Sequence, residues 1–261
     1  MENKTILQKQ IADAIAAANS DRHFAVFDFD NTCIANDIAE ATLNHMARLA
    51  LFRDPAIIPG PEEKDHQALA KKIFQHYYRL LEAGNMLGAY EFGAKTLSGL
   101  NTSEIEALVR DVIAAEGTSI GHVELFDAKI AKGLATRPAV SELINDLQKQ
   151  GIEIWIVSAS PRLLVAEAMK NFGITAKLIG VRHVIKNGII TSELEYPLSV
   201  MGGKVDCIKL FIDPAARPLI GVGDSGNDLP MLEYSDLKAV VDRGNSLSEK
   251  AKASGWSLLN A

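Results

Sequence analysis

The sequence predicts an α/β protein with a Rossmann-like, doubly wound and mostly parallel sheet, into which an all-helical cap domain is inserted. Short apolar runs, typical of buried strands, alternate with stretches that have helical spacing. This alternation implies right-handed crossovers between parallel strands. A long segment after the first strand interrupts it with helical stretches and no convincing strand. The predicted domains are therefore 1–33 plus 134–261 for the core and 34–133 for the cap.

Four apolar runs mark the predicted core strands. They are 24–29 (FAVFDF), 152–157 (IEIWIV), 218–222 (PLIGV) and 237–241 (LKAVV). Helices are predicted after Pro138 and Pro161, because proline is tolerated in the first turn of a helix, and a glycine follows each. Asn187-Gly188 between apolar-rich runs indicates a β-hairpin within 178–192. Apolar residues at helical spacing predict an amphipathic helix in the first twenty residues.

The composition is that of an ordinary globular protein and excludes several function classes. The chain has 261 residues, 48% hydrophobic and 23% charged, with a formal net charge of −6. This mild acidity argues against broad binding to nucleic acid or to an anionic membrane. Cys33 and Cys207 lack metal-ligand spacing, so we expect no disulfide framework and a reducing, cytoplasmic location. We expect neither a signal peptide nor a membrane span, and either a monomer or a homodimer.

The first candidate site is Asp28-Phe29-Asp30-Asn31-Thr32, which follows the first predicted strand. Two carboxylates this close repel each other, and the pKa of one rises unless a cation neutralises them. Mg²⁺ prefers oxygen ligands and keeps water and substrate phosphate in its shell. An acidic loop that merely contacts solvent is the alternative interpretation of this pentapeptide.

A second acidic motif, Gly223-Asp224-Ser225-Gly226-Asn227-Asp228, follows the third predicted strand. Its glycines allow tight turns, and Asp224 and Asp228 are placed to face the same cation. A plain turn with an aspartate at a helix N-terminus is the alternative. The ends of parallel strands meet at one sheet edge, so this motif and Asp28 are expected to converge.

Two further positions complete the candidate site. Ser158 ends the second predicted strand, where its hydroxyl is placed to hydrogen-bond a phosphate oxygen, although Ser160 before Pro161 is a candidate helix N-cap. Lys204 lies in a glycine turn before a predicted helix, where it serves either as a point charge for phosphate or as a solvated cap.

These four motifs, in this order, resemble the haloacid dehalogenase superfamily of phosphohydrolases, over residues 24–32 and about 135–245. The inserted segment resembles the helical cap of the branch that contains phosphoserine phosphatase and phosphorylcholine phosphatase. The resemblance implies that Asp28 attacks phosphorus and becomes an aspartyl-phosphate. It also implies that Asp30 protonates the leaving alkoxide and then activates water.

The resemblance further implies a Mg²⁺ cofactor and two sets of binding residues. The metal set is Asp28, Asp30 through its backbone carbonyl, Asp224, and Asp228, which supports either the metal shell or Lys204. The phosphate set is Ser158, Lys204, Thr32, which positions the nucleophile loop, and Asn227. The expected partner is a small-molecule phosphate monoester.

The substrate is expected to carry an amine or another cation. Phosphoserine phosphatases place a glutamate nine residues after the nucleophile, where this sequence has Asp37, and Glu40 lies close by. Both residues are also explained by a favourable interaction with a helix dipole. The aromatic residues of the cap favour a quaternary ammonium but are more often core; they are His76, Tyr77, Tyr78, Tyr90 and Phe92. No convincing arginine for a substrate carboxylate is found, the loose candidates being Arg48, Arg53 and Arg79.

Two other functions remain open at this level. A phosphotransferase or mutase shares the first half-reaction and differs only in excluding water from the second. A non-enzymatic binding protein on a retained fold is disfavoured, because such chains usually lose the nucleophile and this one keeps Asp28.

Overall fold

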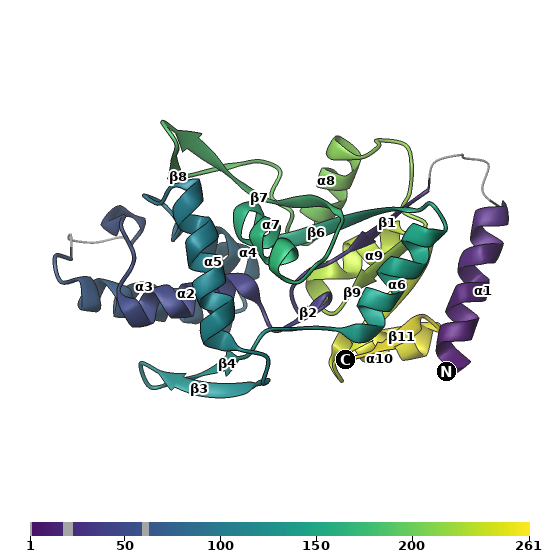
Figure 1. Ribbon diagram of the computed structural model, residues 1–261, viewed down its shortest axis with the longest axis horizontal. Helices are drawn as coiled ribbons and strands as arrows, with labels where there is room; N and C mark the ends of the chain where they lie inside the picture. The colour runs from purple at the N-terminus through teal and green to yellow at the C-terminus, as the bar shows by residue number, and fades with distance from the viewer. Residues whose placement is uncertain (1, 18–22, 59–62) are drawn as a thin grey trace.

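The computed structural model describes residues 2–17, 23–58 and 63–261, and its centre is one twisted sheet (Figure 1). In this part of the chain the sheet has seven strands in the order β11-β10-β9-β1-β6-β7-β8, and only the β7–β8 pair is antiparallel. The strands are β1 (Phe24–Phe27), β6 (Glu153–Pro161), β7 (Lys177–Lys186), β8 (Ile189–Glu195), β9 (Ile220–Gly223), β10 (Leu237–Asp242) and β11 (Ser257–Asn260). The chain winds outward from β1 in both directions, so the expected doubly wound α/β fold is confirmed.

Helices cover both faces of this sheet because its central strands are apolar on both sides. In β1, Ala25 and Phe27 pack into one buried cluster, whereas Phe24 and Val26 pack into another. The first cluster contains residues of α1 (Glu2–Ala17), α6 (Pro138–Lys149) and α7 (Arg162–Asn171). The opposite face is covered by α8 (Gly202–Phe211), α9 (Leu229–Tyr234) and α10 (Ser246–Ser254). The near-continuous apolar runs of the sequence are explained by this two-sided burial.

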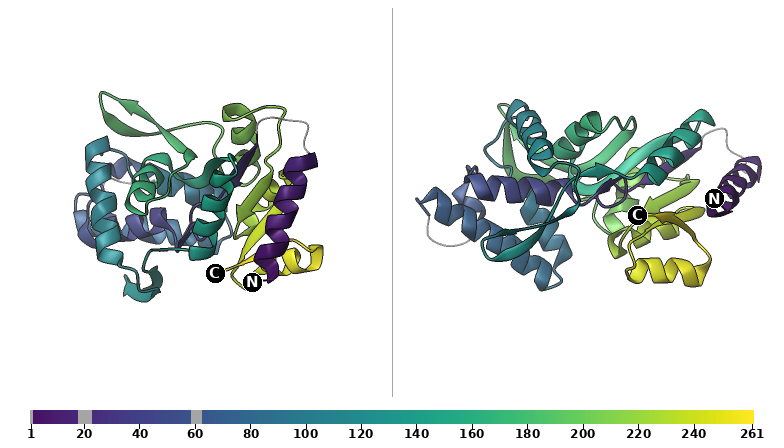
Figure 2. Two further views of the ribbon diagram at one scale, coloured as in Figure 1. Left: turned by 45° about the vertical axis from the view of Figure 1, so that its right-hand side comes forward. Right: turned by 60° about the horizontal axis from the view of Figure 1, so that its bottom comes forward.

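The inserted segment (residues 34–133) lies beside the sheet in all views (Figures 1 and 2). It is joined to the core by a short antiparallel pair in which Ile34 faces Thr136 and Ala35 faces Ala135. Its elements are β2 (Ile34–Ala35), α2 (Ile38–Leu49), the 3₁₀ turn η1 (Pro55–Ile57), α3 (His66–Glu82), α4 (Met86–Lys95), α5 (Thr102–Glu116), β3 (Gly121–Leu125) and β4 (Ala128–Lys132), and β5 (Ala135–Thr136) follows. The described helices bury apolar stripes at helical spacing, as in Ile105, Leu108, Val109 and Val112 of α5.

The expectation of an all-helical cap is wrong, because β3 and β4 form an antiparallel hairpin within it. The strands are half exposed and only five residues long, and β3 alternates between half-buried and exposed positions. Their turn, Phe126-Asp127, has positive φ angles at both residues without the usual asparagine or glycine signal. The hairpin packs through Ile130, which is buried in the main core.

The β7–β8 hairpin confirms the expectation for 178–192 and contacts the inserted segment. Both turn residues have positive φ angles, 51° at Asn187 and 79° at Gly188. Gly99 N donates to Ile190 O at 2.9 Å, and Ile190 N donates to Leu100 O at 2.8 Å. The hairpin therefore joins the sheet edge to the segment that precedes α5.

The expected N-terminal helix is confirmed as α1, which buries Leu7 and Ile11 in the main core. Ile6 and Ala18, part of the same predicted stripe, lie outside the residues whose side chains the structure describes. Across the described ranges, none of the helices combines the length and apolar character that crossing a bilayer demands.

We expect Gly188→Ala to lower the free energy of unfolding by about 1–2 kcal/mol, because a Cβ is strained in the left-handed region. Space is not the cause, since a Cβ at Gly188 meets no atom within 4 Å. Gly121→Ala is the matched control, because its site is equally open and its φ is not in that region. Urea unfolding of both variants is the measurement, and equal effects would contradict the prediction.

Candidate active site

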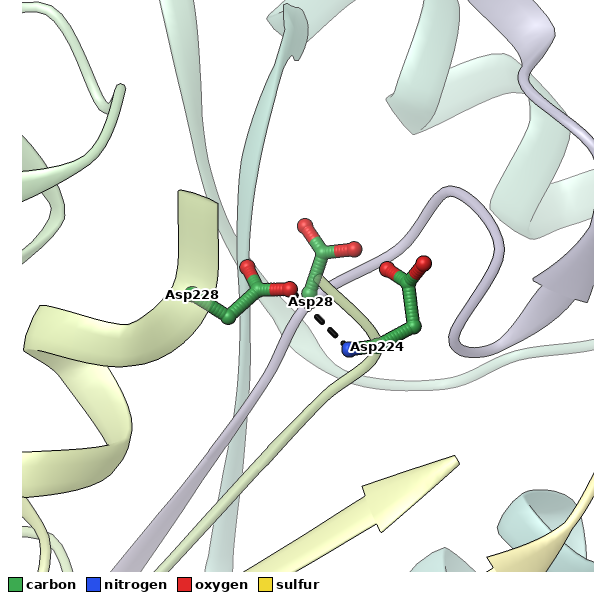
Figure 3. Close-up of side chains that lie close together, drawn as sticks. All are labelled: Asp28, Asp224 and Asp228. Carbon is green, nitrogen blue, oxygen red and sulfur yellow. Dashed lines mark hydrogen bonds between the residues drawn. The ribbon is translucent and has the colours of Figure 1, made fainter. Parts of the chain in front are cut away.

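Three aspartates converge at the carboxyl ends of β1 and β9 (Figure 3). Asp28 follows β1, Asp224 follows its neighbour β9, and Asp228 lies in the 3₁₀ turn η2 (Gly226–Asp228) directly after. One carboxylate oxygen of each lies within 4.8 Å of one oxygen of each of the others. Asp28 is held in place by a hydrogen bond from its N–H to Val222 O at 2.9 Å.

Lys204 lies between two of these carboxylates. Its Nζ is 2.6 Å from Asp28 Oδ1 and 2.6 Å from Asp228 Oδ1, and the side chain is completely buried. Burial by itself lowers the pKa of Lys204, but the charges of Asp228 and Asp28 and their hydrogen bonds outweigh it and raise the pKa above its usual value. The ammonium is therefore permanently charged.

The glycine before Lys204 is required by close packing at the start of α8. A Cβ at Gly203 would lie 2.0 Å from Leu198 O, a distance that no side chain tolerates. Only glycine lets the helix begin this close to the preceding loop. The glycine turn of the sequence therefore positions Lys204 against the two aspartates.

Asp228 holds the loop that carries Asp224. Its Oδ2 accepts hydrogen bonds from Asp224 N at 3.0 Å and Ser225 N at 3.1 Å; the first is the dashed line in Figure 3. Gly223 is needed here as well, because a Cβ would lie 2.5 Å from Asp228 Cβ. Both oxygens of Asp228 are thus engaged by the protein itself.

Thr32 and Asn227 lie at the same centre. Thr32 Oγ1 is 3.2 Å from Asp28 Oδ2 and 3.3 Å from Asp224 Oδ1, and the residue is fully buried. Asn227 Oδ1 accepts a hydrogen bond from Met201 N at 2.7 Å, so it joins the Asp224 loop to the loop before Lys204. Both contacts align protein groups with one another.

Asp30 lines the same cavity as Asp28 and Asp224 but has different hydrogen-bond partners. Its Oδ1 accepts from Ile38 N at 2.7 Å, and its Oδ2 accepts from Ser160 Oγ at 2.6 Å and from Ser158 Oγ at 3.3 Å. Burial, followed by the charges of Asp37 and Asp28, raises the pKa of Asp30 well above its usual value. This shift makes the carboxyl easier to protonate than an exposed aspartate.

Ser160 is a site residue whose role the sequence did not predict. The alternative that it caps a helix is wrong, because it lies within β6, Pro161 precedes α7, and no side chain caps that helix. Both serines are buried, but Ser160 lines the cavity that opens onto Asp28 and Asp224, which is called the main cavity below, and Ser158 does not. Ser158 Oγ accepts a hydrogen bond from Ser160 N at 3.0 Å. The strand continues to Pro161, three residues beyond Ser158, and the sequence pattern did not indicate this extension.

The cluster fits a hard divalent cation. Burial, and next the charge of Asp228, raise the pKa of both Asp28 and Asp224, in the latter to about 6. This means that the fully ionised cluster is unfavourable without an added positive charge. Its donors are all carboxylate oxygens, the ligands that Mg²⁺ prefers. Asp28 and Asp224 would hold the ion at their Thr32-facing oxygens.

A cavity of about 490 Å³ opens onto this centre. Its ionic floor contains Asp28, Asp30 and Asp224 together with Ser160, whereas Asp228 and Lys204 are fully buried and do not line it. Met86 and Tyr90 of α4 line it from the inserted segment, and Asp37 and Arg243 are charged wall residues. The cavity therefore has an ionic floor and a partly apolar wall.

Asp37 and Glu40 line different sets of cavities. Asp37 accepts a hydrogen bond from Glu40 N at 2.9 Å as the N-cap of α2, and it lines the main cavity. Glu40 lines an adjoining cavity of about 120 Å³ and accepts from Tyr78 Oη at 2.8 Å. Burial and the charge of Asp37 raise the pKa of Glu40 to about 7, while the Tyr78 hydrogen bond opposes them.

The aromatic residues and arginines considered as substrate contacts lie in different parts of the structure. Tyr77 and Phe92 belong to the buried core, and Tyr90 lines the main cavity. Arg53 is paired with Glu104, and the arginine that does line the cavity is Arg243, which the sequence argument overlooked. Its position directly after β10 was the available signal, because that strand also ends at this edge.

Comparisons with curated proteins agree with this geometry. The sequence profile of the haloacid dehalogenase-like hydrolases matches residues 25–233. The chain is 29% identical over 254 residues to the phosphorylcholine phosphatase of Pseudomonas aeruginosa, which covers 82% of this chain and 71% of that protein. It is 24% identical over 248 residues to the histidinol-phosphatase of Neisseria meningitidis, which covers 92% of this chain and 99% of that protein.

Solved structures show the same fold. A functionally unknown protein from Anaerococcus prevotii superposes with a TM-score of 0.72 at 24% identity, over 98% of this chain and 91% of that one. A substrate-bound phosphoserine phosphatase has a TM-score of 0.52 at 16% identity, over 85% of this chain and 87% of that one. At these identities the likeness concerns the fold alone. The family profile spans more than half of the sequence, and the chain belongs to the haloacid dehalogenase-like hydrolases.

Proposed function

We propose that this hydrolase cleaves small phosphate monoesters with Mg²⁺ and that Asp28 is its nucleophile. The observation that carries the proposal is the environment of the Asp28 carboxylate. Lys204 holds its Oδ1 at 2.6 Å, Thr32 lies 3.2 Å from its Oδ2, and the residue forms part of the cavity floor. A fixed carboxylate beside a permanent cation is suited to in-line attack on a phosphate.

The proposed reaction has two steps, phosphoryl transfer to Asp28 and hydrolysis of the intermediate. An oxygen of Asp28 forms a bond to phosphorus while the bond from phosphorus to the leaving oxygen breaks, and Asp30 gives that oxygen its proton. The resulting aspartyl-phosphate is then attacked by water, whose proton Asp30 accepts, and phosphate and free Asp28 are regenerated. Mg²⁺, when bound, neutralises charge on the phosphoryl oxygens and lets the anion approach the carboxylates.

In this proposal Lys204 and Asn227 serve the phosphate group, whereas Ser158, expected from the sequence to bind phosphate, lies buried against Asp30. Lys204 offsets charge that develops on the phosphoryl group, and Ser158 together with Ser160 orients Asp30. Asp228 acts by holding Lys204 and the Asp224 loop. The domain division at 33/34 and 133/134 remains a prediction, in which the inserted segment supplies the cavity wall.

A substrate with a cationic group is the substrate class that we favour. The support is the acidic wall residue Asp37, the nearby Glu40 and the phosphorylcholine phosphatase and histidinol-phosphatase relatives. Tyr90 and Met86 offer an apolar face on which methylated or methylene groups can pack. Phosphocholine, phosphoethanolamine and phosphoserine are the compounds to compare.

Asp28→Asn should reduce kcat on p-nitrophenyl phosphate by about 10³-fold or more, since an amide is a poor nucleophile. Phosphate release at saturating Mg²⁺ measures this. The matched control is Asp236→Asn, because Asp236 is an exposed aspartate paired with Arg217. Full activity of Asp28→Asn would refute the role of Asp28 as nucleophile.

Chelation should abolish wild-type activity, and added Mg²⁺ should restore it. Full activity in chelator would refute the requirement for Mg²⁺.

Asp30→Asn should distinguish the two proton transfers. An alkyl phosphate needs protonation of its leaving oxygen, so its hydrolysis should fall by about 10²–10⁴-fold. The aryl oxide of an aryl phosphate is a good leaving group without that proton, so the first step continues. The aspartyl-phosphate should then accumulate, because no base activates water. Acid quenching followed by intact mass spectrometry detects this intermediate as a mass increase of about 80 Da, the mass of a phosphoryl group. Equal loss on both substrates with no adduct would contradict this role.

The pH dependence should depend on substrate charge. Because the pKa of Glu40 is raised to about 7, its carboxyl is neutral below that pH and charged above it. The KM for phosphocholine, divided by that for glycerol phosphate, should therefore fall as the pH rises from about 6 to 8. The two phosphate groups ionise at different pH values, so the wild-type ratio is compared with that of Glu40→Gln, which shares this contribution. A wild-type ratio that follows the same pH course as that of Glu40→Gln would count against a cationic substrate at this position.

A further inference from the structure

Arg243 is brought to the metal centre by the neighbouring strand. β10 pairs with β9 in parallel, and Val240 lies opposite Gly223, the residue before Asp224. Arg243 follows the end of β10 and lines both the main cavity and the adjoining one. Its side chain is 37% exposed, whereas that of Asp224, its ion-pair partner, is 4% exposed.

The two oxygens of Asp224 have different partners. Arg243 Nη1 donates to Oδ2, while Oδ1 lies 3.3 Å from the Thr32 hydroxyl. The same hydroxyl is 3.2 Å from Asp28 Oδ2. Thr32 therefore marks the side on which the two carboxylates approach each other, and Arg243 engages the other oxygen of Asp224. A cation at the Thr32 side and Arg243 do not need the same oxygen.

The backbone of Asp224 is held from the same segment. Asn245 Nδ2 donates to Asp224 O at 2.8 Å, and Asn245 Oδ1 accepts from Ser248 N at 3.0 Å as the N-cap of α10. From the opposite side, Asp224 N donates to Asp228 Oδ2 at 3.0 Å. With the backbone fixed in this way, the rotation of the carboxylate is the main freedom left to Asp224, and Arg243 restricts that rotation.

The charges at the centre agree with this arrangement. Asp28, Asp224 and Asp228 contribute three negative charges, and Lys204 and Arg243 contribute two positive charges through direct ion pairs. A divalent cation then leaves the centre with a small positive charge, which suits an incoming phosphate dianion. Lys204 cannot replace Arg243, because it contacts Asp28 and Asp228 and has no ion pair with Asp224 among the described residues.

We propose that Arg243 is a positioning residue, which fixes the Asp224 carboxylate with Oδ1 turned toward Asp28 and so creates the high-affinity site for Mg²⁺. The inference rests on the proposed function, which supplies the metal. Partners that orient metal-binding carboxylates typically contribute 10–100-fold in affinity. The opposite idea is that Arg243 only fills the place of the cation and competes with it. The two ideas predict effects of opposite sign.

The experiment is Mg²⁺ binding to the substrate-free protein, measured by isothermal titration calorimetry. Arg243→Gln should raise the Kd for Mg²⁺ by about 10–100-fold. Arg243→Lys keeps the charge but loses the planar fork, so its Kd should lie between those of the wild type and Arg243→Gln. Arg217→Gln is the matched control, because Arg217 is paired with Asp236 on the surface. Thermal unfolding of each variant checks that it is folded.

Activity gives a second, separable readout. Because the chemical groups remain, Arg243→Gln should regain most of its activity on p-nitrophenyl phosphate when Mg²⁺ is raised in proportion to its Kd. Unchanged or tighter Mg²⁺ binding in both Arg243 variants would overturn the positioning role while the phosphatase assignment stands. A wild-type protein that neither binds Mg²⁺ nor hydrolyses phosphate esters would instead overturn the proposed function, and this inference with it.

Discussion

The buried ammonium of Lys204 between Asp28 and Asp228 is the interaction on which the rest of the site depends. It joins the end of β1 to the loop after β9 by way of α8, so three elements from distant parts of the sequence are fixed by one cation. A buried charge pair of this kind has a large desolvation cost and is strongly destabilising when one partner is removed. Glycine is needed at positions 203 and 223, because a Cβ there would clash with Leu198 O and with Asp228 Cβ, respectively.

Excess negative charge is the main constraint around that pair. Asp28, Asp30, Asp37 and Asp224 all face one cavity, and burial raises the pKa of each of these carboxyl groups. The structure manages the charge differently at each position. Asp30, whose pKa burial raises well above its usual value, is held by serine hydroxyls, whereas Asp224 is paired with Arg243. In the proposed mechanism, acid–base work falls to Asp30 and metal binding to Asp28 and Asp224, a division that follows from their different surroundings.

Much of the core was predictable because its signals are local. Both-face burial produces apolar runs, and the four predicted strands all occur, with boundaries that differ by a few residues. β11 and the β3–β4 hairpin were missed, since their strands are four or five residues long and half exposed, and therefore lack a continuous apolar run. Among site residues, Ser160 and Arg243 were missed for a different reason. Each gains its role from a partner more than fifteen residues away in the chain, Asp30 in one case and Asp224 in the other.

The sequence by itself determined the α/β class, the placement of Asp28, Ser158 and Asp224 at one sheet edge, and the family resemblance. The first two follow from the strand pattern and from the rule that the carboxyl ends of parallel strands meet at one edge, and the third follows from four motifs in order. Only the tertiary structure decided which oxygen meets which donor, that Ser160 contacts Asp30 most closely, and that α4 walls the cavity. Such contacts depend on side-chain rotamers and on the packing of the inserted segment. Neither is encoded by the spacing of residues along one chain.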